Sequence, residues 1–181
     1  MRLNTFIEET IEEFRKRLCR ALEGLTDTEL SWQPDPEVNS IAFIVWHIVR
    51  VEDRWTHWFA QGVDDVWVRE GWHQKFGLPE RDTGIGYTAE QVGEFPALGG
   101  EDLKSYFEDV RVDTLGFLRD LSSADLELVP GRAPFRDHPG PVASFGTPFS
   151  IGRMYRQLIG EHNQHLGQVA LLRGMQRGMD G

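Results

Sequence analysis

The chain has 181 residues, of which 40% are hydrophobic and 27% charged, so it holds enough apolar side chain for a folded core and too much for a disordered chain. Asp and Glu outnumber Lys and Arg by 29 to 19, and the formal net charge of −10 argues against nucleic-acid binding and membrane attachment. The one cysteine, Cys19, excludes an intramolecular disulfide and a cysteine-rich metal site. We expect one domain over residues 1–181.

Helical periodicity predicts two long helices in the first third of the chain. The first covers residues 3–23 and ends at Gly24. Its expected buried stripe is Phe6, Ile7, Ile11, Phe14, Leu18 and Leu22. Thr26 begins a capping-box pattern, which predicts a short helical turn. The second long helix begins at 38–40, continues to 61 and ends at Gly62; because it is apolar nearly all round, it should lie at the centre of the fold.

The rest of the chain predicts two further long helices. Residues 62–100 are rich in glycine and predict a structured excursion, with a short helix capped at Thr88. The third long helix is expected over residues 101–121, with a buried stripe of Leu103, Phe107, Val110, Leu115 and Leu118. After a segment rich in Pro and Gly at 130–148, the fourth helix should begin with Thr147 as its N-cap and Pro148 as its first residue, and run to about Arg173. No alternating pattern indicates a sheet, so we predict an all-α four-helix bundle with a long crossover.

The expected compartment is the cytoplasm. The N-terminal residues 1–17 are charged throughout, unlike a signal peptide. The longest apolar run, residues 41–49, is interrupted by His47 and is too short to span a bilayer.

A polar cluster on the predicted fourth helix is the strongest candidate for chemistry. Glu161 and His165 are four residues apart and therefore lie about 40° apart on one helix face, with His162 as a further neighbour. His47 adds an imidazole from the apolar second helix. Such residues on two helices can form a metal site of the kind found inside helical bundles. The alternative is a structural cluster in which His165 binds a neighbouring helix and Glu161 pairs with an arginine.

The other reactive residues give weaker signals. Cys19 lies beside an apolar stripe and is expected to be inert. Glu52 and Asp53 are expected to form surface pairs with nearby arginines, the alternative being that they orient an imidazole. Most of the six tryptophans should lie in the core, and a few should line a pocket near the metal. No spacing supports His73 or His138 as ligands.

Three blocks of the sequence resemble the DinB-like superfamily of metal-dependent proteins. The first block runs from Leu25 to Leu30 and is followed by Pro34. The second combines the run that ends in Trp46 and His47 with residues 51–55, and the third is the run from Glu161 to Gln168. Together with the four-helix pattern, the resemblance covers nearly the whole chain.

This resemblance implies an up-down-down-up four-helix bundle that holds a divalent metal, usually zinc or nickel, near one end. One ligand comes from the second helix and two from the fourth, which places His47, Glu161 and His165 in the ligand positions. The common family pattern has a histidine where this chain has Glu161, but carboxylate oxygen is also a zinc ligand. The site could therefore use Glu161, could use His162 in its place, or could be degenerate.

The resemblance also implies an activity. Members with a known reaction are mostly transferases or isomerases in which the metal activates a low-molecular-weight thiol. We therefore expect a thiol transferase that acts on a small-molecule electrophile. The alternatives are a metal-dependent hydrolase and a non-enzymatic bundle. The apolar second helix is also compatible with a homodimer formed through helix faces.

Overall fold

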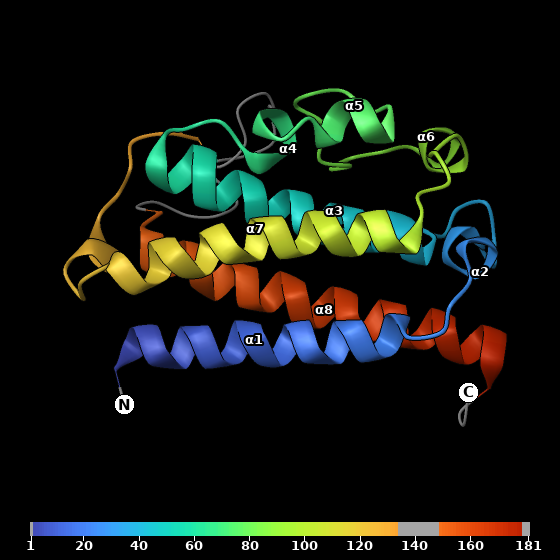
Figure 1. Cartoon of the computed structure of the whole chain (residues 1–181), viewed down its shortest axis with the longest axis horizontal. Helices are drawn as coiled ribbons and strands as arrows, with labels where there is room; N and C mark the ends of the chain where they lie inside the picture. Colours follow the sequence, from blue (N-terminus) through green and yellow to red (C-terminus); the bar gives the residue numbers. More distant parts are fainter. Residues whose placement is uncertain (1, 134–148, 179–181) are drawn as a thin grey trace.

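The computed structural model describes residues 2–133 and 149–178, and it contains four long helices that run along one axis (Figure 1). These helices are α1 (Leu3–Leu22), α3 (Ile41–Asp53), α7 (Gly100–Asp120) and α8 (Ile151–Arg177). A π-helix, η1 (Arg54–Gln61), continues α3. α1 and α8 run in one direction and α3 and α7 in the other, and the described residues contain no β-strand. The predicted all-α, up-down-down-up bundle is confirmed.

Short helices connect the long ones, and two of them begin where the sequence predicts. These short elements are α2 (Asp27–Ser31), α4 (Val66–Arg69), α5 (Trp72–Phe76), α6 (Ala89–Gly93) and the 3₁₀ turn η2 (Asp125–Glu127). α2 and α6 each begin at a complete capping box, at Thr26 and Thr88. α4 and α5 were not predicted because helices of four and five residues are too short to show a period.

Two details of the helices differ from the prediction. α8 begins at Ile151, and its N-cap is Ser150, whose hydroxyl accepts a hydrogen bond from the Arg153 amide. The predicted start at Thr147 and Pro148 was therefore wrong, and those two residues lie outside the described part of the chain. Phe6, expected in the buried stripe of α1, is 47% exposed because the core side of this helix follows Ile7, Ile11, Phe14 and Leu18.

A buried polar layer divides the hydrophobic core into two clusters. One cluster surrounds the first half of α3 and includes Phe14, Val49 and Leu166. The other surrounds η1 and includes Val51 and Leu158. The polar layer lies between the two clusters. It consists of Glu52 from α3, Arg111 from α7 and His162 from α8.

The polar layer ties all four long helices together. The Arg111 guanidinium donates to both carboxylate oxygens of Glu52, each at 2.8 Å, and to the Ile11 carbonyl on α1. The His162 Nε2 atom lies 3.1 Å from the same carboxylate. Burial alone would raise the pKa of Glu52, but Arg111 and His162 hold that pKa well below its ordinary value. The prediction that Glu52 pairs with an arginine at the surface was wrong.

A second buried network fastens the excursion between α3 and α7 onto α3. The Asp53 carboxylate accepts the backbone amides of Val66 and Trp67, each at 2.9 Å, and also binds Arg50. Arg50 reaches further along the excursion and donates to the Asp82 carbonyl. Asp53 is therefore buried, which also contradicts the predicted surface pair. These bonds fix the excursion beside the middle of α3.

Within the described residues, no helix combines the length and the apolar character that crossing a bilayer requires.

Candidate metal centre

His47 lies in the middle of α3, with its ring oriented by the excursion. Its Nδ1–H donates to the Thr83 carbonyl at 2.5 Å. That carbonyl is positioned from both sides, because Arg50 holds the preceding carbonyl and Gly84 packs against α3. Gly84 has φ +74°, and a Cβ there would lie 2.8 Å from the Trp46 ring, so only glycine fits. The Nε2 atom of His47 is then the nitrogen left for another partner.

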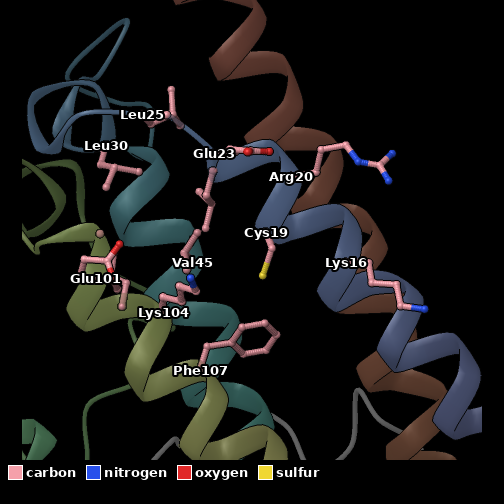
Figure 2. A pocket seen from close by; sticks show the side chains of 14 residues that line it. Lys16, Cys19, Arg20, Glu23, Leu25, Leu30, Val45, Glu101, Lys104 and Phe107 are labelled. Atoms are coloured by element: carbon pink, nitrogen blue, oxygen red, sulfur yellow. The ribbon is translucent and has the colours of Figure 1, made fainter.

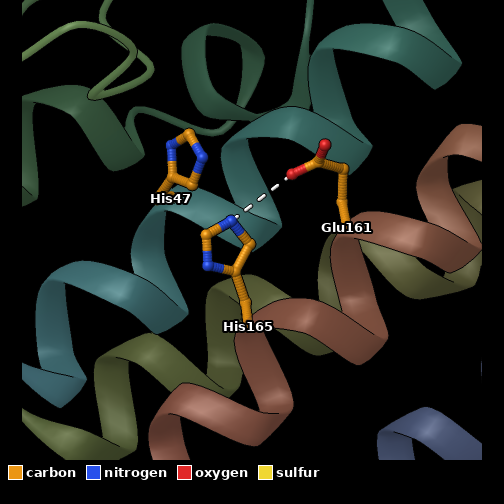
Figure 3. A group of neighbouring side chains, drawn as sticks. All are labelled: His47, Glu161 and His165. Carbon is orange, nitrogen blue, oxygen red and sulfur yellow. Dashed lines mark ion pairs between the residues drawn. The ribbon is translucent and has the colours of Figure 1, made fainter.

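Glu161 and His165 come from α8 and face His47 across the gap between the two helices (Figure 3). Their four-residue spacing places them on one face of α8, where the His165 Nε2 atom lies 3.4 Å from Glu161 Oε2. The His165 Nδ1–H donates to Gln168 Oε1 at 2.7 Å. Both histidines thus use Nδ1 for an outer hydrogen bond and turn Nε2 toward the same point.

The three side chains converge closely enough to hold one ion. Their ligand atoms all lie within 4.8 Å of one another, and the two imidazole rings are 5.2 Å apart between centroids. Ligands about 2.1 Å from a tetrahedral zinc ion are about 3.4 Å apart, so small side-chain rotations complete the site. All three residues are partly buried, and they leave a fourth ligand position, as catalytic zinc sites do. The donor set therefore fits a divalent metal.

The protonation states of His47 and Glu161 suit a metal site. Burial lowers the pKa of His47 below its ordinary value, which favours the neutral imidazole that a metal needs. The hydrogen bond with His165 lowers the pKa of Glu161, so this carboxylate is charged at neutral pH. Burial opposes protonation of His165, but its bonds to Glu161 and Gln168 outweigh burial and raise its pKa in the absence of metal.

Aromatic side chains from α3 and the excursion lie beside His47. Phe43 stacks on the His47 ring with a centroid distance of 6.1 Å and also contacts Tyr87 and Phe95. Four of the six tryptophans, Trp46, Trp55, Trp67 and Trp72, are buried, which confirms that most of them lie in the core. That a few line a pocket near the metal stays a prediction.

The remaining candidate residues lie away from this centre. His162 is fully buried and stacks on Phe14 at 4.0 Å in the polar layer, so it does not replace Glu161. The His73 Nδ1–H donates to the Trp67 carbonyl, and Cys19 lies on α1 as a half-buried free thiol. His138 falls outside the described residues.

Two outer residues of the site were missed by sequence reasoning. Gln168 could have been found, because it follows His165 by three residues and so shares its helix face. Thr83 could not, because it acts through its backbone carbonyl, which every residue possesses.

Comparisons with known proteins agree with this fold. A family model described as the DinB superfamily matches residues 10–169. A crystal structure described as that of a conserved protein from Enterococcus faecalis aligns with a TM-score of 0.79 at 20% sequence identity, over 97% of each chain. This likeness shows a shared fold. No curated protein sequence matches the chain.

Proposed function

The chain belongs to the DinB superfamily, and from this premise we propose that it is a divalent-metal-dependent transferase that adds a low-molecular-weight thiol to a small electrophile. The metal would be zinc or nickel, held by His47, Glu161 and His165. The observation that carries the proposal is the convergence of two outward-bonded histidines and one carboxylate on a single point.

The charge of the donor set favours an anionic fourth ligand. Two neutral imidazoles and the Glu161 carboxylate supply one negative charge, so a divalent ion keeps one positive charge uncompensated. A bound divalent cation would lower the pKa of a coordinating thiol and leave a nucleophilic sulfur at neutral pH.

The residues around the site supply orientation and an apolar surface. Thr83 and Gln168 fix the tautomers of the two histidines, which keeps both Nε2 atoms directed at the ion. Tyr87 is half-buried and packs on Phe43, which stacks on His47, so its ring offers an aromatic surface that suits an apolar or aromatic electrophile.

The test is a screen of thiol consumption. Zinc-loaded and nickel-loaded protein would be mixed with a generic aromatic electrophile and, in turn, with mycothiol, bacillithiol, glutathione and coenzyme A. We expect turnover with one thiol that is lost in His165→Ala and kept in His73→Ala, whose imidazole lies away from the site. Ester or amide hydrolysis without thiol consumption would refute the transferase and identify a hydrolase, and inactivity in both assays would favour a non-enzymatic bundle.

A further inference from the structure

A cavity of about 640 Å³ opens between α1 and α7, close to α2 (Figure 2). Val45 of α3 forms part of its wall. Val45 precedes His47 by two residues, which corresponds to about 200° around the helix. The cavity therefore lies on the opposite side of α3 from the candidate metal centre and serves none of its residues.

The cavity exists because the contacts between α1 and α7 stop partway along the two helices. Polar contacts join the first part of α1 to the last part of α7: Asn4 with Leu118, Glu8 with Arg119, and Arg15 with Glu108. At the other end, α2 packs against the start of α7. Its Asp27 accepts the Gly100 amide at the start of α7, and the Leu30 side chain packs against Gly100.

The lining of the cavity is apolar inside and charged at the rim. Apolar side chains come from all the surrounding helices: Leu22, Leu25, Leu30, Val45, Leu103 and Phe107. Lys104 lies toward the Arg15 end of the cavity and forms no ion pair with a described residue, whereas the Lys16 and Arg20 side chains extend from α1 away from the cavity (Figure 2). Glu23 and Glu101 lie toward the α2 end, because α1 and α7 are antiparallel.

Cys19 lies on the wall of the cavity near Lys104, and its sulfur points inward (Figure 2). Burial raises the pKa of the Cys19 thiol, so it is neutral at physiological pH and does not repel an anion. As the one cysteine of the chain, it can also report on whether the cavity is filled.

We propose that this cavity is a second binding site, for a small organic monoanion with an apolar or aromatic body. The anionic group would lie beside Lys104, and the body would cover the apolar floor. The volume is in the range of small-molecule sites, roughly 300–1,000 Å³. Glu23 and Glu101 at the other end exclude a second negative charge on the ligand.

The test uses 8-anilinonaphthalene-1-sulfonate, an aromatic monoanion whose fluorescence rises on binding, and N-phenyl-1-naphthylamine, which has the same body without the charge. We expect saturable binding of the anion, at least about tenfold tighter than that of the neutral compound. Lys104→Glu should weaken anion binding about tenfold. The control Arg156→Glu, an equal charge change at an exposed position on α8, should leave it within about twofold.

Two measurements at Cys19 test whether the anion binds inside this cavity. Saturating anion should slow alkylation of the Cys19 thiol by iodoacetamide, and Cys19→Phe should place a ring in the cavity and weaken binding, whereas Cys19→Ser should retain it. Helix content from circular dichroism would check each variant. If Cys19→Phe fails to fold, the alkylation rate and Lys104→Glu still decide. Absence of saturable binding, equal binding of both compounds, or binding that neither Lys104→Glu nor Cys19→Phe weakens would overturn the proposal.

Discussion

Glu161 and His162 are consecutive residues on α8 that face opposite environments. The Glu161 side chain is 31% exposed and reaches His165 at the candidate metal centre, whereas the His162 side chain is 1% exposed and contacts Glu52 in the buried polar layer. The helical step of about 100° between them places one residue toward the gap with α3 and the other toward the core. The polar layer thereby fixes the rotation of α8 at the position where the metal centre is built.

Metal content should depend on both histidines of the candidate centre. Wild-type protein loaded with zinc should retain about one ion per chain after desalting, and His47→Ala and His165→Ala should each lose it, because two ligands do not make a stable zinc site. His73→Ala is the matched control and should retain the ion. Elemental analysis measures the ratio, and stoichiometric zinc in both ligand variants would place the metal elsewhere.

Gln168 should tune metal affinity without binding the metal. Gln168→Leu removes the acceptor for the His165 Nδ1–H, so the ring loses its fixed orientation, and we expect affinity to fall about 10- to 100-fold. Gln164→Leu changes an exposed glutamine of the same helix and should have no effect. Competition with a chromogenic chelator gives both affinities. An equal loss in the two variants would indicate damage to α8 rather than to the site.

Removing one charge of the Glu52–Arg111 pair in the polar layer should strongly destabilise the fold. Glu52→Gln removes the buried counter-charge of the Arg111 guanidinium and leaves it only the Glu12 carboxylate at 3.5 Å, so we expect a loss of about 3–5 kcal/mol in the free energy of unfolding. Glu52→Leu combined with Arg111→Met removes both charges and should cost less than Glu52→Gln alone. Arg15→Ala breaks the exposed pair with Glu108 and should cost less than about 1 kcal/mol. Urea titrations measure all four proteins, and similar losses for Glu52→Gln and Arg15→Ala would contradict the assignment.

His57 should make the stability of the bundle depend on pH. Burial alone would lower its pKa, but the Asp53 carboxylate at 2.8 Å and Asp113 at 3.2 Å raise it above 6.5. Because the folded pKa is higher than the unfolded one, this stabilisation is complete below about pH 6.5 and is lost as pH rises through the folded pKa.

His57→Gln should therefore lower the free energy of unfolding at acidic pH, and the difference from wild type should shrink as the pH is raised. Chemical denaturation at a series of pH values gives this difference directly. A gap that stays constant or widens toward high pH would show that His57 is neutral in the folded protein.

The sequence predicted the long elements well and the interior poorly. Periodicity and the glycines at 24 and 62 located α1 and the continuous helix of α3 and η1 to within a few residues, because these signals are local. The burial of Glu52 and Asp53 was missed because their partners are brought by other elements, such as Arg111 from α7. The three candidate ligands could be named from helical spacing and resemblance, but Thr83 depends on how the excursion folds back.

The hydrogen bond between His47 and Thr83 makes one imidazole a shared partner of the excursion and of any ion at Nε2. A ligand that binds only while the excursion is packed against α3, the docked state, stabilises that state by RT ln(1 + [L]/Kd). This amounts to about 2.7 kcal/mol when the ligand concentration is a hundredfold above Kd. A substitution near Asp82 that lowers the docked fraction of the excursion should therefore weaken the affinity at Nε2 in proportion to that fraction. Residues that do not contact the ion thus influence the affinity with which it is bound.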